Sequence, residues 1–239
     1  MKKALVLFSG GKDSFLSACK LIEEGFEVFL VTYENSCGLG ALNVTHGAER
    51  IISKYGKEKV HFLEAYNTIS VWREFFLPFM NMTPSQILKE YGEISYSQFN
   101  CLTCRSSMYI YSIAICKTLD ITNICEGARY SQKFAIETKP LLSKYKEVLK
   151  LFNIDLLLPV VDIDSDWQLK NELLLRGFIP KTLESQCLLG IPLSKNGISE
   201  TEINGVCSFF DKEITPKIHN LVEKVEKTLQ FNTNIKTFI

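Results

Sequence analysis

The 239-residue sequence lacks any run of 18 uninterrupted apolar residues, the length that a membrane-spanning helix requires. It also lacks a net charge, because 27 basic side chains balance 27 acidic ones. The first absence excludes a membrane span. The second argues against a protein whose whole surface binds nucleic acid, but leaves room for a local basic face. Internal repeats and low-complexity tracts are absent too, and 46% hydrophobic residues are enough for a large core.

The amino terminus lacks the pattern of a secretory signal. Met1, Lys2 and Lys3 precede only five apolar residues, 4–8, and no small-residue cleavage pattern follows. We therefore expect a cytoplasmic protein without membrane partners. In that compartment the eight cysteines are expected to be thiols or metal ligands rather than disulfides.

The hydrophobic pattern predicts alternating strands and helices. Residues 3–8 and 27–33 predict buried strands, and residues 13–24 between them predict a helix that ends at Gly25. A strand, a helix and a strand within about thirty residues form a βαβ unit, which requires a parallel sheet. The alternation continues, with further strands predicted over 60–63, 122–126 and 156–161 and further helices over 43–55, 106–119, 164–176 and 214–229.

Residues 67–100 interrupt this alternation with many aromatic side chains and two prolines, Pro78 and Pro84. We expect helices and loops here that either cover one end of the sheet or add core. The sequence thus predicts one α/β domain over residues 1–205, with an aromatic-rich insertion at 67–100, followed by a helical tail at 206–239.

The strongest motif lies between the first predicted strand and helix, and reads Ser9-Gly10-Gly11-Lys12-Asp13-Ser14. Glycines let the backbone approach a ligand without a Cβ in the way. Backbone N–H groups at a helix start lack partners, and the helix dipole favours negative charge there. The lysine adds a cation and the serines add hydroxyl donors. An ordinary strand-to-helix turn also uses Gly-Gly, but the complete hexapeptide favours a pyrophosphate site. It is not a Walker A loop, which has a longer spacing before its Gly-Lys pair.

This hexapeptide after an amino-terminal strand resembles the PP-loop of the adenine-nucleotide α-hydrolase superfamily, the ATP pyrophosphatases. The resemblance implies a Rossmann-like, doubly wound five-stranded parallel sheet with helices on both faces. It also implies cleavage of ATP between its α- and β-phosphates, with magnesium on the phosphates. The family's loop holds the leaving pyrophosphate, a role that falls here to Ser9, Gly10, Gly11, Lys12, Asp13 and Ser14. The family also places the end of the second strand, including Tyr33, beside the adenine.

The second motif is the Cys-x-x-Cys pair Cys101 and Cys104, followed by Arg105 and a predicted helix. Two thiolates at this spacing can converge on one centre, and a helix start lowers their pKa. The pair suits zinc, an iron–sulfur cluster or a redox couple. The contexts of three other cysteines predict core positions, whereas Cys37 and Cys207 stay open; the predicted core cysteines are Cys19, Cys116 and Cys125.

The order of a PP-loop, a mid-chain Cys-x-x-Cys and one late cysteine resembles the tRNA thiolation enzymes that hold a 4Fe–4S cluster on three cysteines. The matching positions are Cys101, Cys104 and Cys187. In that branch one iron stays open for a sulfur donor. A zinc site that includes Cys207, and thiols without a metal, remain the alternatives.

The segment after the fourth predicted strand departs from the thiolation branch. Where those enzymes often carry His and Asp, this chain has a Gly-x-Arg sequence, Gly127 to Arg129. That sequence resembles the sulfate-adenylate reductase relatives, in which the arginine meets phosphate or sulfate. A surface position for Arg129 is the alternative. His46, His61 and His219 have no mutual spacing that indicates a metal site, and we expect structural roles for them.

Taken with these resemblances, the motifs predict an ATP-dependent adenylating enzyme. It would activate a carbonyl oxygen for sulfur transfer, with a tRNA base as the acceptor and a separate sulfur donor or carrier as partner. A small-molecule ligase resembling cyano-deazaguanine synthases, a sulfate-adenylate reductase-like protein and a nucleotide-binding regulatory protein are the alternatives. The sequence leaves a homodimer open.

Overall fold

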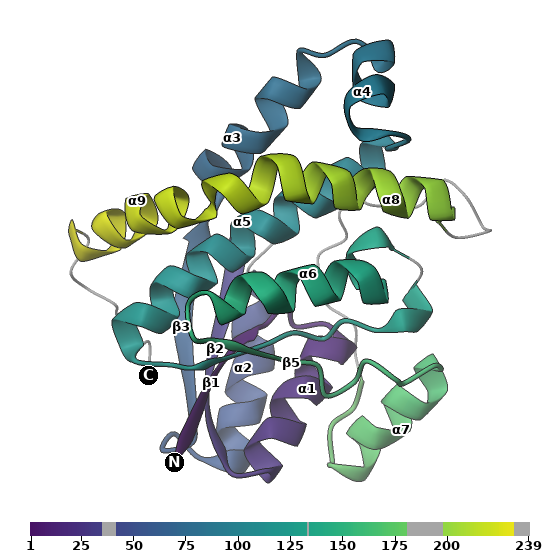
Figure 1. Ribbon diagram of the computed structural model, residues 1–239. Coiled ribbons are helices and arrows are strands. Elements are labelled where there is room, and N and C mark those ends of the chain that lie inside the picture. Colours follow the sequence, from purple (N-terminus) through teal and green to yellow (C-terminus); the bar gives the residue numbers. More distant parts are fainter. Residues whose placement is uncertain (35–41, 133, 181–197, 232–239) are drawn as a thin grey trace.

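The computed structural model describes residues 1–34, 42–132, 134–180 and 198–231. Its centre is one sheet of five parallel strands in the order β3-β2-β1-β4-β5, which confirms the predicted fold class (Figure 1). The strands are β1 (Lys2–Leu7), β2 (Phe26–Glu34), β3 (Val60–Asn67), β4 (Asn123–Cys125) and β5 (Asp155–Leu157).

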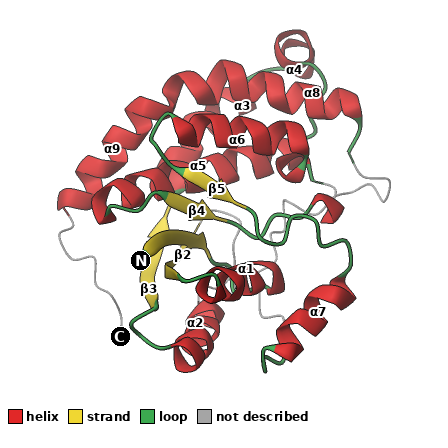
Figure 2. Ribbon diagram, turned by 60° about the horizontal axis from the view of Figure 1, so that its bottom comes forward, coloured by secondary structure: helices red, strands yellow, loops and turns green. Residues whose placement is uncertain are grey.

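Helices cover both faces of the sheet, as a parallel sheet requires. The helices of one face are α1 (Lys12–Glu23), α2 (Leu42–Tyr55) and α7 (Asp166–Leu175). The other face carries α3 (Ile69–Met80), α5 (Tyr96–Leu119), α6 (Lys139–Lys150), α8 (Glu200–Phe209) and α9 (Ile218–Phe231) (Figure 2). Side chains alternate along β1, so that Ala4 and Val6 pack toward α1 while Leu5 packs toward α5. Two hydrophobic clusters result, one on each face.

The remaining elements are short. α4 (Pro84–Tyr91) follows α3, and the described residues also form four single turns: η1 (Tyr130–Gln132), η2 (Ala135–Glu137), η3 (Phe210–Ile214) and η4 (Thr215–Lys217). Within the described part of the chain, no helix is both long enough and apolar enough to traverse a bilayer.

The aromatic-rich insertion forms α3, α4 and the first turns of α5. Its rings interlock: Phe79 stacks on Phe99 with centroids 3.5 Å apart, and both contact Phe209 of α8. The insertion therefore adds core. It also reaches the end of the sheet, because Ile69 and Asn100 line the pocket described below. The segment therefore combines a core role with a contribution to the pocket wall.

Side chains of α8 and α9 belong to the same hydrophobic cluster as those of α5. Figure 1 shows the two carboxyl-terminal helices lying across α5. The boundary predicted between residues 205 and 206 falls inside α8. Gly205 lies so close to the turn before α5 that a Cβ on it would be 2.1 Å from the Glu93 carbonyl oxygen. Residues on both sides of the predicted boundary thus pack on the α/β domain.

The prediction that the Cys-x-x-Cys pair precedes its helix is wrong. α5 begins at Tyr96, ten residues before the predicted start at Ser106, because Ser95 caps it by accepting a hydrogen bond from the Gln98 N–H. No glycine or proline interrupts the sequence after this cap. Cys101 and Cys104 therefore lie one helical turn apart inside α5, beyond the unpaired N–H groups of a helix start.

The sheet order reverses beside β1. β2 lies on one side of β1 and β4 on the other, so the loops after β1 and β4 leave the carboxyl edge of the sheet next to each other. Open α/β sheets bind their ligands at such a switch point.

Candidate active site at the carboxyl edge of the sheet

The loop after β1 turns sharply into α1. Gly10 has a φ of +76°, a conformation that residues with side chains rarely adopt. Gly11 is the N-cap residue of α1, and no described side chain caps this helix start. The first-turn N–H groups therefore face outward with the positive end of the helix dipole, an arrangement that favours an anion.

Ser9 and Ser14 fix the shape of this loop. Their hydroxyl oxygens are 3.2 Å apart, the Ser9 N–H donates to Ser14 Oγ, and Ser14 Oγ donates to the Gly11 carbonyl at 3.1 Å. The two predicted hydroxyl donors thus also hold the loop backbone in place.

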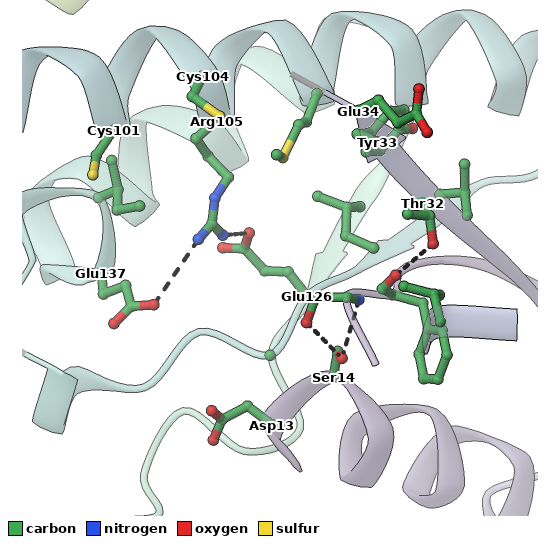
Figure 3. A pocket seen from close by; sticks show the side chains of 18 of the residues that line it. Asp13, Ser14, Thr32, Tyr33, Glu34, Cys101, Cys104, Arg105, Glu126 and Glu137 are labelled. Carbon is green, nitrogen blue, oxygen red and sulfur yellow. Dashed lines mark hydrogen bonds and ion pairs between the residues drawn. The ribbon is translucent and has the colours of Figure 1, made fainter. Parts of the chain in front are cut away.

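A pocket of about 610 Å³ lies between this loop, the ends of β1 and β2, and α5 (Figure 3). Its volume falls within the usual range for small-molecule sites. Predicted site residues from several segments line this pocket. They are Ser9, Asp13 and Ser14 of the loop, Tyr33 near the end of β2, Gly127 after β4, and Cys101 and Cys104 of α5.

The end of β2 forms one wall of the pocket. The Tyr33 hydroxyl lies 2.7 Å from Ser112 Oγ of α5, and burial raises the pKa of Tyr33 well above its ordinary value. Thr32 Oγ1 donates to the Phe8 carbonyl at 2.7 Å, which ties β2 to the end of β1. Val31, Thr32 and Tyr33 all line the pocket, where the family resemblance expects the adenine.

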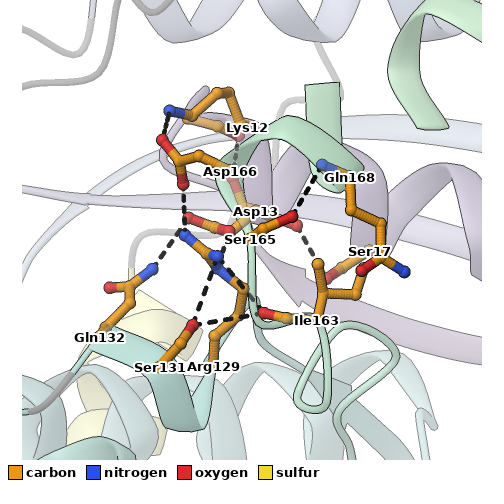
Figure 4. Close-up of polar contacts among 12 residues, drawn as sticks. Lys12, Asp13, Ser17, Arg129, Ser131, Gln132, Ile163, Ser165, Asp166 and Gln168 are labelled. Carbon is orange, nitrogen blue, oxygen red and sulfur yellow. Dashed lines mark hydrogen bonds and ion pairs between the residues drawn. The ribbon is translucent and has the colours of Figure 1, made fainter. Parts of the chain in front are cut away.

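Alternating charges surround the loop lysine and aspartate (Figure 4). Arg129 Nε lies 2.6 Å from Asp13 Oδ1, and the same guanidinium contacts Asp166 of α7 at 2.8 Å. Lys12 Nζ contacts the other oxygen of Asp166 at 2.9 Å, and Gln132 donates to Asp13 Oδ2 at 3.0 Å. Burial raises the pKa of Asp13, although the two cations oppose the shift.

Arg129 is only 6% exposed, so the alternative of a surface position for it is wrong. Its guanidinium is compensated by Asp13 and Asp166. The hydrogen bond with Lys12 is the main cause that lowers the pKa of Asp166. Asp166 and Gln132 were not among the predicted site residues.

Gly127 lets the loop after β4 touch the start of α1. A Cβ at this position would lie 2.6 Å from the Ser14 backbone nitrogen and 2.9 Å from Asp13 Cβ. Real side chains do not tolerate such distances to backbone, so only glycine fits without a shift of the loop. Glycine is thus required here for the contact between the two segments, and the predicted binding role of Gly127 stays a prediction.

A second charged group occupies the pocket wall beside α5 (Figure 3). Arg105 forms a close ion pair with Glu126, at the end of β4, and lies 3.9 Å from Glu137 of η2. Both carboxyl side chains are buried, with exposures of 1% and 5%. Burial raises the pKa of Glu137 to about 8, despite the opposing charge of Arg105.

Sequence reasoning missed both of these glutamates as site residues. Glu126 carried a usable signal, because a charged residue directly after a buried strand marks the carboxyl edge of the sheet. Glu137 carried no such signal in the sequence, because the segment before α6 shows neither a clear strand pattern nor a clear helix pattern.

The cysteines divide as follows. Cys101 and Cys104 line the pocket on the α5 side, whereas Cys37 and Cys187 lie outside the described residues. Cys207 is half-buried on α8, where burial raises its pKa. Cys19, Cys116 and Cys125 are buried in the core, as predicted.

Among the described residues, no three His, Cys, Asp or Glu side chains form a group that could hold a metal ion. Cys207 therefore does not join Cys101 and Cys104 in a metal site of described residues. The three histidines belong to no such group among the described residues either. His61 Nε2, for example, lies 2.8 Å from Glu27 Oε1.

Fold and site together are those of the PP-loop ATP pyrophosphatase superfamily: a doubly wound parallel sheet with the glycine-rich loop after its first strand at the switch point. A family model described as thiamine biosynthesis protein (ThiI) matches residues 1–167, well over half of the chain. The chain therefore belongs to the ThiI family.

One solved structure shares the fold, and a second serves for comparison. A 4-thiouridine synthetase in complex with RNA, with bound ATP, superposes with a TM-score of 0.63 at 16% identity over 95% of this chain. The match covers 54% of that protein, so this chain spans about half of its length. The U34-tRNA thiolase NcsA from Methanococcus maripaludis, solved with its [4Fe-4S] cluster, gives 0.45 at 12% identity, covering 100% of this chain and 75% of that one. No curated protein sequence matches the chain.

The raised pKa of Glu137 predicts a pH-dependent stability. Between its ordinary value of 4.5 and about 8, the folded protein keeps a proton that the unfolded chain releases. The free energy of unfolding should therefore fall as pH rises through this window, by up to about 1.4 kcal/mol per pH unit. Glu137→Gln removes this contribution. Urea unfolding at pH 5 and pH 8 should show the variant gaining about 2 kcal/mol or more over wild type at the higher pH.

The exposed Glu147→Gln variant of α6 serves as the control, and its stability should parallel that of wild type across the same range. Parallel curves for wild type and Glu137→Gln would show instead that Glu137 titrates normally in the folded protein.

Proposed function

We propose that the chain is an enzyme that cleaves ATP to AMP and pyrophosphate, and that it thereby activates a carbonyl oxygen for sulfur transfer to a tRNA base. One observation carries the proposal: the PP-loop and the Cys101–Cys104 pair line the same pocket. Membership of the ThiI family supports ATP-dependent sulfur chemistry. A fold shared with a 4-thiouridine synthetase that binds RNA and ATP supports tRNA as the acceptor.

The loop supplies the site for the leaving pyrophosphate. Backbone N–H groups at the start of α1 and the Lys12 ammonium stabilise the negative charge that develops as the bond to the α-phosphorus breaks. Lys12 would exchange its contact with Asp166 for one with phosphate. The adenine takes the wall formed by Thr32 and Tyr33, and Gly127 keeps the loop after β4 against the phosphates.

Magnesium fits this site as a companion of the nucleotide. Mg²⁺ is usually bound by one or two carboxylates together with substrate phosphates. Asp13 offers such a carboxylate, buried at the pocket wall beside the helix start. When bound, the ion would neutralise phosphate charge, while Arg129 and Gln132 orient the Asp13 carboxylate.

Adenylation explains why ATP is needed. A carbonyl oxygen is a poor leaving group, whereas the same oxygen bound to AMP leaves as a phosphate ester. The carbonyl oxygen of the base attacks the α-phosphorus, pyrophosphate departs, and sulfur then displaces AMP from the carbon.

The cysteines mark where sulfur is delivered. We propose the three-cysteine 4Fe–4S cluster of Cys101, Cys104 and Cys187 as their role. The described residues supply two of the three thiolates, which is the donor type that such clusters use. When bound, the cluster would present sulfur to the activated carbon. Zinc, or thiols without metal, remain the alternatives.

The sulfate-adenylate reductase-like alternative is less favoured, because it requires Arg129 to bind sulfate or phosphate. The guanidinium of Arg129 already contacts both Asp13 and Asp166, within an almost fully buried position. Its positive charge is thus paired with these two carboxylates rather than with a bound sulfate or phosphate.

Replacing Lys12 or Asp13 with alanine tests the nucleotide chemistry. With unmodified tRNA and α-labelled ATP, each variant should form AMP at least about 100-fold more slowly, because charge stabilisation at the phosphates is lost. Lys170→Ala, on the exposed side of α7, is the matched control and should retain the wild-type rate. Release of ADP and phosphate by the wild-type protein would contradict cleavage at the α-phosphate.

Serine substitutions test the cysteines. Cys101→Ser and Cys104→Ser should abolish thiolated product and cluster absorbance in anaerobic spectra, while ATP binding stays unchanged because neither thiol lies on the loop. Cys207→Ser should behave like wild type, since Cys207 does not line the pocket. Zinc that is lost in Cys207→Ser would support the zinc alternative instead. Thiolated product from Cys101→Ser would refute its role.

A further inference from the structure

We infer that Glu137 is the catalytic proton acceptor and donor of this site: it takes the N–H proton of the base as the carbonyl oxygen is adenylated, and returns a proton to that nitrogen as sulfur replaces AMP. The inference rests on the proposed function. It assigns the proton transfer, which neither the PP-loop nor the Cys101–Cys104 pair performs, to Glu137.

The position of Glu137 is the first argument. It lines the pocket together with Cys101 and Cys104, and Figure 3 shows its carboxyl group between α5 and Asp13. The side chain is buried, yet its Oε2 atom has no hydrogen-bond partner among the described residues. Buried polar atoms are nearly always hydrogen-bonded, so an unpartnered carboxyl oxygen at a pocket wall indicates a partner that arrives with the substrate.

Elimination among the carboxyl groups gives the second argument. Four described carboxyl side chains line the pocket. Asp13 bonds Arg129 and Gln132, and Glu126 forms the close ion pair with Arg105. Glu34 is exposed at the end of β2, on the wall that the adenine would take. Asp13 Oδ1 and Glu126 Oε1 also lack a hydrogen bond among the described residues, but each of these carboxyl groups has an arginine in close contact. Glu137 is the buried carboxyl group of the pocket whose nearest cation is as far as 3.9 Å away.

The chemistry requires such a group. In the first step the carbonyl oxygen of an N–H–C=O unit forms a bond to the α-phosphorus, and the bond to the bridging oxygen breaks to release pyrophosphate. The electron pair of the N–H bond becomes the new C=N bond, and its proton passes to the Glu137 carboxylate. Without this transfer the adenylated base would carry a positive charge.

The second step uses the stored proton. A sulfur donor equivalent to hydrosulfide adds to the carbon, and AMP leaves with the electron pair of the C–O bond. Protonated Glu137 returns its proton to the ring nitrogen, the sulfur loses its own proton to solvent, and a thiocarbonyl remains. Glu137 ends as a carboxylate, and the two steps together release one proton.

The charges around Glu137 suit this role. Arg105 of α5 and Arg129 after β4 favour its ionised form, whereas Glu126 and Asp13 disfavour it, and burial is the largest influence. The resulting pKa of about 8 lies close to neutral pH, where a group can both accept and donate a proton efficiently. Glu126 acts as a positioning residue that holds Arg105.

The test compares pH profiles of kcat/KM for AMP formation with unmodified tRNA. Wild-type kcat/KM should rise with pH to a plateau above about 8, as Glu137 becomes ionised. Glu137→Gln should be slower by about 10²- to 10⁴-fold and should lack this rise. Glu137→Asp keeps a carboxyl group, and should restore part of the rate together with a pH-dependent rise.

Three controls distinguish a loss of proton transfer from a loss of ATP binding or of folding. ATP binding by equilibrium dialysis should be retained in Glu137→Gln, its melting temperature at pH 5 should match wild type, and exposed Glu147→Gln should match wild type throughout. Wild-type AMP formation that equals the Glu137→Gln rate, with the same pH profile, would overturn the inference while leaving the proposed function intact. A wild-type protein that forms no AMP with tRNA would overturn the proposed function itself.

Discussion

The close approach of two backbone segments at the switch point determines the geometry of this site. The loop after β4 touches the first turn of α1 at Gly127, where even one added carbon would lie 2.6 Å from the Ser14 nitrogen. This contact brings Arg129 to Asp13 and places Glu126 opposite α5. A wider separation would leave the anion-binding helix start open on one side and would remove the cation that orients Asp13.

The charged side chains form two groups with different tasks. Near the loop, Lys12, Asp13, Arg129 and Asp166 alternate in sign, so cations are already held where phosphate charge would develop. Beside α5, Arg105 contacts two buried glutamates and is nearest to Glu126. In the proposed mechanism, the weaker contact of Arg105 with Glu137 leaves this carboxyl group able to exchange a proton. In the same mechanism, phosphate binding at the loop and proton transfer at Glu137 use different walls of one pocket, and Cys101 and Cys104 line that pocket on the α5 side.

Much of this could be predicted from sequence, because the relevant signals are local. The alternation of apolar segments predicted the parallel sheet, and the hexapeptide at residues 9–14 predicted the loop between β1 and α1 that lines the pocket, while its binding of an anion stays a prediction. The start of α5 was predicted wrongly because the cap at Ser95 was not recognised, so the environment of Cys101 and Cys104 was misjudged. The Gly-x-Arg sequence singled out Arg129, but not its contacts with Asp13 and Asp166. Asp166 and Glu137 come to the site only through contacts with segments distant in sequence, which no local pattern indicates.

The central claim is that one pocket holds ATP on the loop and sulfur chemistry at the cysteines. A crystal structure with a non-cleavable ATP analogue, bridged by carbon between its α- and β-phosphates, tests it most directly. The account predicts the β- and γ-phosphates on residues 10–14, the adenine against Thr32 and Tyr33, and the α-phosphate open toward Cys101 and Cys104. An analogue bound outside this pocket, or one with its adenine against the cysteines, would contradict the account.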